Sequence, residues 1–229
     1  MLSDTVGVCI TTLNEADTIG DLVGRLRGMG YDVFIADGGS TDGTIGKACQ
    51  AGAVVKRMGT TGRTPIGPCL RDAWRMALQA GCTTIVQMDA GGSHQLEDLP
   101  VLLSTRADVV IGSRFVRGAR YEGRFWRAIL SEVAAVACNL VQSGPWVHDW
   151  TSGYRVYRAA AVRELLAHGY VASGHSFHLE ALAYARRAGL TVAEVPITYR
   201  AGRSSFSWHS VNEAFLTWQH ILHNVGGHR

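Results

Sequence analysis

The stretch TTIVQMDAGGSHQLEDLP, residues 83–100, decides the fold of this chain. Its first part, 83–88, is an apolar run with the length and β-branched content of a buried strand. Asp89 follows at the predicted end of that strand, and two glycines and Ser93 lead to a predicted helix over 95–103, with Ser93 as its cap. An acid at the carboxyl end of a parallel strand, beside glycine-rich backbone, is where open α/β sheets bind ligands.

One expected acid is missing from this stretch. A second carboxylate two residues after Asp89 would help to hold a divalent cation against a diphosphate, because hard cations prefer oxygen ligands. The chain has Gly91 at that position. We therefore expect Asp89 to be a metal or ribose ligand, and we expect metal binding to be weakened or moved to other ligands.

Outward from this stretch, strand-like apolar runs alternate with helical patterns. We expect strands over 6–11, 33–36, 53–56, 83–88 and 108–112. This alternation predicts an α/β fold with a mostly parallel sheet flanked by helices, an architecture that binds nucleotides. Asp37 ends its strand as Asp89 does, and a glycine turn and a helix start follow it.

The second half has a different pattern. It contains a long apolar helix over 125–141, a short strand over 154–157, helices from 159 and over 176–188, a strand over 191–199 and a last helix over 211–225. Pro196 predicts that the strand over 191–199 lies at a sheet edge, because proline cannot donate a ladder hydrogen bond. With no internal repeat or linker, one domain over 1–229 is the simplest interpretation.

Composition excludes several classes of protein. The 229 residues are 47% hydrophobic, which indicates a well-filled core, and the net charge of +3 is too weak to indicate nucleic-acid binding. The five cysteines are scattered, as expected for buried thiols in a reducing compartment, so we predict a cytoplasmic location. The first residues lack a signal-peptide pattern, and no apolar stretch reaches the roughly 18 residues that span a bilayer.

Five arginines fall within one short segment, at positions 114, 117, 120, 124 and 127. They are either the solvated entry to a helix or a phosphate-binding wall, since the planar guanidinium group matches phosphate oxygens. Arg114 has a third possible role, as the partner of an acid inside the fold.

Nine segments, in order along nearly the whole chain, match motifs that occur together in one enzyme family: Thr11–Glu15 (TTLNE), Ile35–Thr44 (IADGGSTDGT), Gly67 with Arg71, Gln87–Pro100, Val110–Val116 (VIGSRFV), Arg127 with Ser131, Asp149–Arg158 (DWTSGYRVYR), Phe177–Glu180 and Glu194–Thr198. They resemble the family 2 glycosyltransferases of the GT-A fold, most closely the dolichol- or polyprenyl-phosphate mannose synthases. Each motif alone is weak, but nine in register are specific.

The resemblance implies transfer of a sugar from a nucleotide-diphosphate donor such as GDP-mannose or a UDP-sugar, with inversion at the anomeric carbon. It implies a divalent metal, Mg²⁺ or Mn²⁺. It also implies a nucleotide-sugar-binding half over 1–117 and an acceptor-side half over 118–229. A phosphate acceptor needs no general base, whereas a sugar hydroxyl does.

The same resemblance suggests roles for individual residues. Glu15 and Asp37 are candidates for nucleotide recognition, or else acids at helix starts. Asp149 and Glu180 are candidates for the acceptor side and its base, with a turn-capping role as the alternative for Asp149. The remaining positions that the motifs mark are Thr11, Asn14, Gly67, Arg71, Ala90 and Ser131 for donor binding, and Arg117 and Arg127 for phosphate.

Four departures from the family pattern affect the expected chemistry. Gly91 replaces the second metal acid, Gly38 replaces one of an acid pair, and the donor loop becomes Pro65-Ile66-Gly67-Pro68, with Leu70 at a tyrosine position. Glu132 and Ser204-Ser205 replace basic residues that the family is thought to use for the lipid phosphate. These changes leave three alternatives: a polyprenyl-phosphate acceptor, a soluble sugar or nucleoside-type acceptor, or a binding protein without catalysis.

Membrane contact is expected to be peripheral at most. The last helix could place Phe215 and Trp218 in a lipid surface, but its polar face carries Glu213 and histidines and is not basic. We therefore favour packing of this helix against the core. A histidine at position 94 could approach a metal ion, although a structural role is the stronger expectation.

Overall fold

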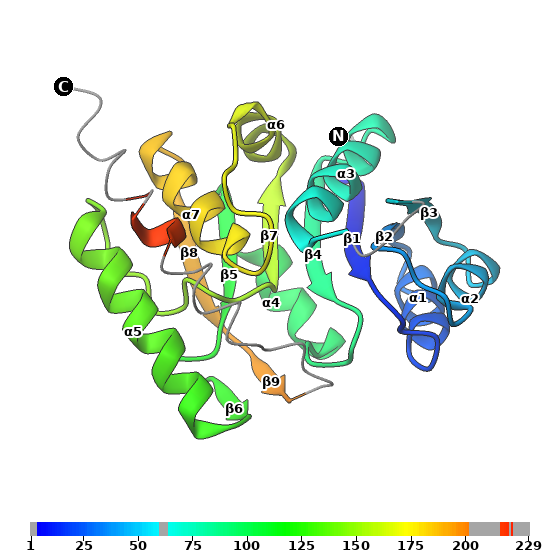
Figure 1. Cartoon of the computed structure of the whole chain (residues 1–229), viewed down its shortest axis with the longest axis horizontal. Coiled ribbons are helices and arrows are strands. Elements are labelled where there is room, and N and C mark those ends of the chain that lie inside the picture. Colours follow the sequence, from blue (N-terminus) through cyan, green and yellow to red (C-terminus); the bar gives the residue numbers. More distant parts are fainter. Residues whose placement is uncertain (1–3, 60–63, 202–215, 220, 222–229) are drawn as a thin grey trace.

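The structure is a computed structural model that describes residues 4–59, 64–201, 216–219 and 221 (Figure 1). Its centre is a seven-stranded sheet with the order β3-β2-β1-β4-β7-β5-β8. The strands are β1 (Val6–Thr12), β2 (Asp32–Asp37), β3 (Val54–Arg57), β4 (Thr84–Asp89), β5 (Val109–Ser113), β7 (Arg155–Arg158) and β8 (Val192–Pro196). Every pairing is parallel except those of β7, which runs antiparallel to β4 and β5. The predicted α/β fold with a mostly parallel sheet is confirmed.

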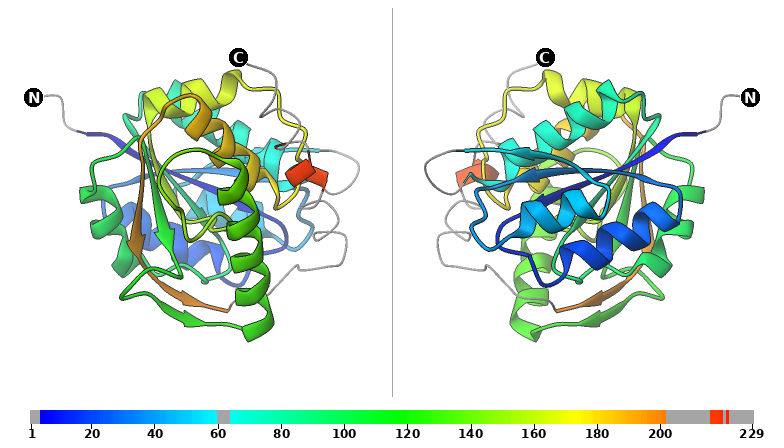
Figure 2. Two further views of the ribbon diagram at one scale, coloured as in Figure 1. Left: turned by 90° about the vertical axis from the view of Figure 1, so that its left-hand side faces the viewer. Right: turned by 90° about the vertical axis from the view of Figure 1, so that its right-hand side faces the viewer.

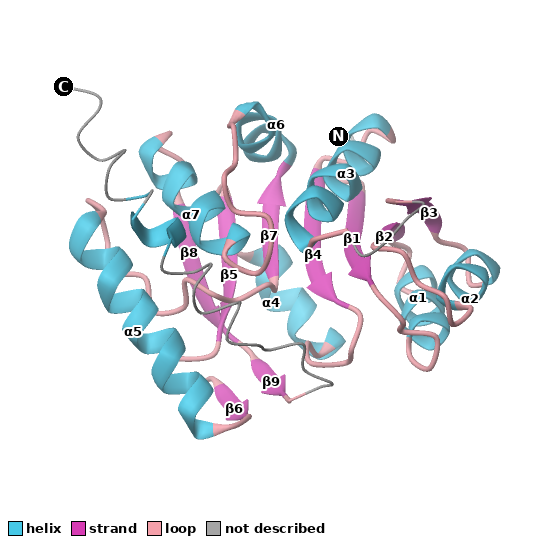
Figure 3. Cartoon of the chain, viewed as in Figure 1, coloured by secondary structure: helices cyan, strands magenta, loops and turns pink. Residues whose placement is uncertain are grey.

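Helices cover both faces of this sheet (Figures 2 and 3). They are α1 (Ile19–Gly28), α2 (Thr44–Gln50), α3 (Ile66–Gln79), α4 (Leu99–Ser104), α5 (Phe125–Val141), α6 (Ala159–Ala167) and α7 (Phe177–Arg187). Strand β1 shows why two cores form, because successive side chains point to opposite faces. Cys9 packs with Trp74 and Phe177 on the side of α3, α6 and α7, whereas Val8 and Ile10 pack with α1 and α4.

The strand expected over 191–199 is two strands. β8 ends at Pro196, and β9 (Thr198–Arg200) pairs with β6 (Arg120–Glu122) in a separate parallel pair (Figure 3). Ile197 makes the break, since its buried side chain packs in the core, its N–H donates to Ser113 O and its carbonyl accepts from Arg120 N. β8 is an edge strand, as Pro196 predicted.

Local backbone sets several helix starts. Asn14 has a φ of +58°, outside the helical region, so α1 begins only at Ile19. α3 begins at Ile66 and has Pro68 in its first turn, where proline is tolerated. The helix expected from 95 begins with a 3₁₀ turn over Leu96–Asp98, with no side-chain cap at its start.

The last helix is described only at 216–219 and 221; the rest of 211–225, including Glu213 and Phe215, lies outside the described residues, as do Ser204 and Ser205. Trp218 donates its indole N–H to Ala137 O of α5 at 3.2 Å, and Ile221 is buried in the core. This described part packs against the protein, as favoured from its charge. Within the described residues, no helix combines the length and apolar character that crossing a membrane requires.

Candidate active site

The carboxyl ends of β1, β2 and β4 meet at one edge of the sheet. Thr12 is in register with Asp37, and Thr11 with Asp89, so the residues that follow β1 lie between these two strand ends. The predicted residues Asn14, Glu15, Asp37 and Asp89 therefore share one region. Polar groups at the carboxyl ends of adjacent parallel strands form the usual ligand crevice of such sheets.

Asp37 faces the interior of this region. It is fully buried, and its Oδ1 accepts from Thr12 Oγ1 at 2.9 Å. Its Oδ2 accepts the backbone N–H groups of Gly39 at 3.0 Å and Ser40 at 2.8 Å. The carboxylate thus orders the turn after β2 and has its acceptor positions occupied, a geometry that favours positioning over direct contact with a base or ribose.

Asn14 ties this turn to the loop after β1. Its N–H donates to Ser40 Oγ at 2.8 Å, and its Oδ1 accepts from Thr41 N at 2.9 Å. The next N–H, of Glu15, donates to Thr44 Oγ1 at 2.8 Å. Because both ends of this short backbone stretch are fixed, the Glu15 side chain is held over the strand ends.

The Glu15 carboxylate lies beside the position of the missing acid. A Cβ built on Gly91 would be 3.9 Å from Glu15 Oε1 and 4.0 Å from its Oε2. Asp89, two residues earlier, has a side chain that is 51% exposed, whereas Ala90 between them is buried. The half-exposed Asp89 carboxylate and the Glu15 carboxylate beside Gly91 therefore lie at the end of β4, where the sequence predicted metal binding.

His94 contacts both the backbone and the side chain of Asp89. The Asp89 N–H donates to His94 Nδ1 at 3.1 Å, and His94 Nε2 is 3.7 Å from Asp89 Oδ2. The ring is buried and stacks on Tyr154 at a centroid distance of 4.7 Å, and burial lowers the pKa of His94. Since Nδ1 accepts, the proton of the neutral ring is on Nε2, which faces the carboxylate. This geometry matches the expected structural role.

Asp149 is paired within the fold. Arg114 donates Nε to Asp149 Oδ2 and Nη2 to Oδ1, both at 2.7 Å, and the carboxylate is fully buried. Burial alone would raise the pKa of Asp149, but the adjacent Arg114 guanidinium outweighs burial and lowers it. Asp149 Oδ1 also accepts the Ser152 N–H at 3.0 Å, which is the turn-capping contact considered above. The predicted pairing of Arg114 with an internal acid is confirmed.

Glu180 is likewise buried and occupied. Its carboxylate accepts the N–H groups of Val171 at 3.1 Å and Ala172 at 2.7 Å. The neighbouring Ser173 carbonyl accepts from Gly67 N at 2.6 Å, and a Cβ on Gly67 would lie 3.0 Å from that oxygen. Glu180 and Gly67 are thus parts of one contact between the loop before α7 and the start of α3. Arg71 lies over the Tyr170 ring in the same contact, 5.5 Å from its centroid.

The remaining predicted residues lie around α5. Ser131 Oγ accepts from Thr151 Oγ1 at 3.0 Å, and Thr151 in turn accepts from Arg114 Nη2, so Ser131 is connected to the Arg114–Asp149 pair. Arg127 lies over the Trp126 ring at 5.3 Å, and Arg117 is exposed before β6. The arginine segment therefore divides into Arg114, whose side chain is 12% exposed, the half-buried Arg127, and three exposed arginines at positions 117, 120 and 124.

Known proteins resemble this chain over most of its length, although no family model matches it. The polyprenol monophosphomannose synthase of Mycolicibacterium smegmatis is 31% identical over 221 residues, which cover 91% of this chain and 83% of the relative. The undecaprenyl-phosphate mannosyltransferase of Micrococcus luteus is 33% identical, covering 90% and 89%. The chain belongs to their family of glycosyltransferases.

Solved structures give the same fold. Glucosyl-3-phosphoglycerate synthase from Mycobacterium tuberculosis, in complex with phosphoglyceric acid, superimposes with a TM-score of 0.68 at 20% identity, covering 96% of this chain and 81% of that one. Its complex with Mn²⁺ and UDP-glucose gives a TM-score of 0.67 at 22% identity, covering 99% and 80%. This glycosyltransferase therefore has the GT-A fold that the motifs implied.

A second histidine of the glycosyltransferase, His178, lies beside Gly153 as Asp89 does, and no motif indicated it strongly. The Gln87 amide nitrogen donates to Gly153 O at 3.0 Å and lies 3.3 Å from His178 Nδ1. A Cβ on Gly153 would be 3.4 Å from His178 Nε2 and 3.3 Å from Asp89 Oδ1. Burial lowers the pKa of His178 well below its ordinary value, so the ring is neutral, with its proton on Nε2. The one available signal was its place in the Phe177–Glu180 motif, where the family has glutamine.

We expect Gly153→Ala to lower the kcat/KM of the glycosyltransferase about tenfold, because Asp89 is the expected metal or ribose ligand, and displacing such a group lowers the rate steeply. The added methyl group would press on Asp89 and His178 together. Gly46→Ala is the matched control, since Gly46 lies in α2 with no atom within 4 Å of a built Cβ. Steady-state kinetics and thermal unfolding of both variants check this expectation. Full activity in Gly153→Ala would show that Asp89 needs no fixed position.

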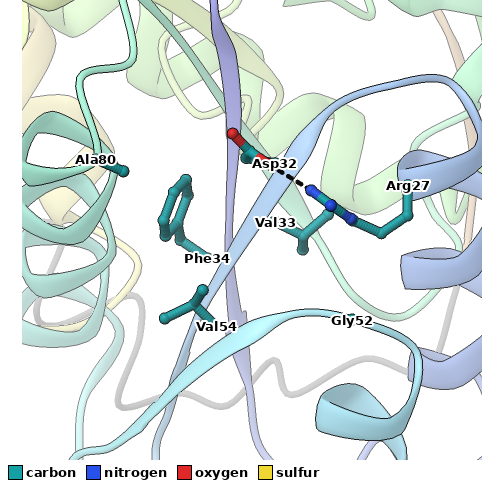
Figure 4. Close-up of a pocket in the computed structure, with 7 residues that line it drawn as sticks. All are labelled: Arg27, Asp32, Val33, Phe34, Gly52, Val54 and Ala80. Carbon is teal, nitrogen blue, oxygen red and sulfur yellow. Dashed lines mark hydrogen bonds and ion pairs between the residues drawn. The ribbon is translucent and has the colours of Figure 1, made fainter.

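A hollow at the other end of the sheet is less suited to the reaction. It is lined by Arg27, Asp32, Val33, Phe34, Gly52, Val54 and Ala80 (Figure 4). Asp32 begins β2, so this hollow opens at the amino end of the strand, away from Asp37 and Asp89. Its two charged side chains pair with each other.

Proposed function

We propose that this glycosyltransferase transfers a sugar from a nucleoside diphosphate to a polyprenyl phosphate, at the carboxyl ends of β1, β2 and β4. The observation that carries the proposal is the Asp89 carboxylate, half exposed at the end of β4 and positioned by His94. The curated relatives named above act, by their names, on polyprenyl phosphates. The structurally similar glucosyl-3-phosphoglycerate synthase was crystallised with UDP-glucose, which supports a nucleotide-sugar donor.

The kind of acceptor is inferred from whether a carboxylate is available to act as a general base. A sugar hydroxyl would need a carboxylate base in hydrogen-bond reach, whereas a phosphate is already an anion. Asp149 and Glu180, the two predicted bases, are both buried with their oxygens accepting hydrogen bonds. This supports a phosphate oxygen as the nucleophile, which attacks the anomeric carbon while the bond to the diphosphate breaks and its electron pair leaves with the diphosphate. In this proposal Asp149 and Glu180 are positioning residues.

Glu132 does not argue against a phosphate acceptor. Glu132 replaces a basic residue of the family, and at close range it would repel a phosphate. In the structure Ser131 faces Thr151, while Glu132 is exposed on α5. The exposed position of Glu132 removes much of the repulsion that the sequence suggested.

A divalent cation fits the corner formed by Asp89 and Glu15. Both are carboxylates, the oxygen ligands that Mg²⁺ and Mn²⁺ prefer, and Glu15 lies beside Gly91, two residues after Asp89. We propose that Asp89 is the first protein ligand and that Glu15 supplies the oxygen that residue 91 provides elsewhere in the family. When bound, the cation would stabilise the negative charge that develops on the departing diphosphate. The related synthase from M. tuberculosis was crystallised with Mn²⁺.

We expect Glu15→Gln to weaken Mn²⁺ binding at least tenfold, because a neutral amide is a poorer ligand than a carboxylate. Adding Gly91→Asp to Glu15→Gln should restore much of that affinity, and Gly91→Asp alone should tighten binding if the corner is intact. Mn²⁺ titration followed by electron paramagnetic resonance measures this without turnover. Equal Mn²⁺ affinity in all of these proteins would mean that the ion is held elsewhere or not at all.

A donor panel tests the proposed function directly. Radiolabelled GDP-mannose and UDP-glucose are each incubated with the protein and undecaprenyl phosphate, with and without Mn²⁺ or Mg²⁺. We expect metal-dependent transfer of label into the organic phase. Label in a small water-soluble product would indicate a soluble acceptor instead. Donor binding without turnover under every cation would indicate a binding protein.

A further inference from the structure

One nitrogen of the His178 ring lies at the candidate active site without a protein partner. His178 is 6% exposed and is the second residue of α7. Its Nε2 atom is 3.4 Å from the position that a Cβ on Gly153 would take, and Asp89 Oδ1 is 3.3 Å from the same position. Within the part of the chain that the structure describes, Nε2 makes no hydrogen bond. Because buried polar atoms are nearly always satisfied, this nitrogen marks a place for a ligand atom.

The hydrogen bonds around the ring make Nε2 a donor. Gln87 Nε2 lies 3.3 Å from His178 Nδ1 and also donates to Gly153 O at 3.0 Å, which fixes the orientation of the amide. An amide nitrogen only donates, so His178 Nδ1 accepts and the ring proton is on Nε2. The His178 carbonyl accepts from Arg155 Nη1 at 3.0 Å, which ties the start of α7 to β7. The ring therefore presents one N–H from a fixed position.

Gly153 leaves a gap that has a donor on one side and an acceptor on the other. The donor is the His178 N–H, and the acceptor is the Asp89 carboxylate, whose side chain is 51% exposed. A hydroxyl group suits this pair, because it donates one hydrogen bond and accepts others. An ionised phosphate oxygen suits it less, because it has no proton to donate and Asp89 would repel its charge. The gap is therefore suited to a sugar hydroxyl.

The order of the strands indicates which sugar supplies this hydroxyl. The candidates for nucleotide recognition, Glu15 and Asp37, follow β1 and end β2, on one side of β4. Gly153 precedes β7, which is the neighbour of β4 on the other side. A diphosphate held at the end of β4 would have its nucleoside toward β1 and β2 and its transferred sugar toward β7. This arrangement favours the transferred sugar over the ribose.

We infer that His178 donates a hydrogen bond from Nε2 to a hydroxyl of the transferred sugar, and that this hydroxyl donates to Asp89. His178 is then a residue that selects the donor sugar. A carboxylate has about four lone-pair sites, so the contact is compatible with a cation on Asp89. The family has glutamine at position 178, whose amide can donate or accept, whereas this ring only donates. The inference rests on the nucleotide-sugar donor of the proposed function and not on its acceptor.

Donor binding in the absence of an acceptor tests the contact. His178→Phe keeps a ring but lacks the N–H, so it should raise the Kd of GDP-mannose or UDP-glucose about tenfold and leave the Kd of GDP or UDP unchanged. His178→Gln should recover part of the loss, because its amide can donate. Tyr184→Phe is the matched control, since it removes from α7 a donor that contacts Glu164 at 2.9 Å, and it should bind as the wild type does. Calorimetry with Mn²⁺ measures each Kd, and thermal unfolding verifies that each variant is folded.

Donor analogues that each lack one sugar hydroxyl identify the ligand atom. Removal of one particular hydroxyl should weaken binding about tenfold less in His178→Phe than in the wild type, because the hydrogen bond is already absent from the variant. Removal of any other hydroxyl should have the same effect in both proteins. This pattern would assign the His178 N–H to one hydroxyl of the transferred sugar.

Three results would overturn the inference. The first is an equal effect of His178→Phe on the sugar nucleotide and on the free nucleoside diphosphate. The second is an equal loss in both proteins for every hydroxyl removed. The third is a raised KM for the acceptor with an unchanged donor Kd, which would assign the N–H to the acceptor. Label in a water-soluble product of the donor panel would reject the polyprenyl-phosphate acceptor and leave these donor affinities as they are.

Discussion

Asp149→Asn is expected to lower the free energy of unfolding by about 3–5 kcal/mol, because it leaves the Arg114 guanidinium buried without its counter-charge. The pair is bidentate at 2.7 Å, and Asp149 is fully buried. For a domain of this size each kcal/mol is worth about 2–4 °C in Tm, so the Tm should fall by roughly 6–20 °C. Thermal and urea unfolding measure both quantities.

Two further measurements separate this role from that of a base. Arg114→Met with Asp149→Leu should be less destabilising than the two single changes added together, since the double variant leaves no buried charge. A base acting only in the reaction would instead give an Asp149→Asn protein with unchanged Tm and no turnover. That result would contradict the positioning role proposed here.

The pair also has a defined pH dependence. The folded pKa of Asp149 is below its ordinary value, so the carboxylate stabilises the fold fully above the pKa of the unfolded chain. This contribution is lost as the pH falls through the folded pKa, in the acidic range. Asp149→Asn should remove that part of the acid dependence of stability, which a series of urea melts at decreasing pH would reveal.

Asp89→Asn is expected to lower kcat/KM by about a thousandfold while leaving stability nearly unchanged, because it removes a charged ligand of the cation that would stabilise the departing diphosphate. The side chain is half exposed and its nearest cation-forming neighbour, His94, is a neutral ring, so little folding energy depends on its charge. Steady-state kinetics, Mn²⁺ titration and thermal unfolding together check the expectation.

Asp21→Asn is the matched control, since Asp21 is an exposed carboxylate in the first turn of α1. It should keep full activity and Mn²⁺ affinity. If Asp89→Asn retained activity within a few-fold of the wild type, the corner at the end of β4 would not be the place where the diphosphate charge is stabilised.

The fold was predictable because its central strands, such as β1 and β5, are buried on both faces and are therefore continuous apolar runs. Val8, Cys9 and Ile10 show this, since each packs in one of the two cores. β6 escaped prediction because it has only three residues, two of them charged. β9 was predicted as strand but was merged with β8, because the break between them depends on Ile197 entering the core.

The location of the candidate site was predictable, but the direction in which its aspartate side chains point was not. Asp37 and Asp89 end neighbouring strands in similar sequence contexts, yet Asp37 points inward to Ser40 while Asp89 is half exposed. This difference arises from partners that are distant in the sequence. The burial of Asp149 has the same origin: the backbone N–H groups of His148 and Asp149 donate to the Glu194 carboxylate, 46 and 45 residues away. His178 was missed for the same reason.

Strand β7 has a consequence for how the chain reaches this structure. It lies between β4 and β5, so residues near 156 join two strands that were completed more than 40 residues earlier. Until β7 emerges during synthesis, β4 and β5 each have an unpaired edge, which is a template for association with other chains. A fragment that ends near residue 117 would keep those edges permanently. Residues 1–117 and 118–229 are therefore one folding unit, in which the second segment supplies strand β7, which joins the strands of the first.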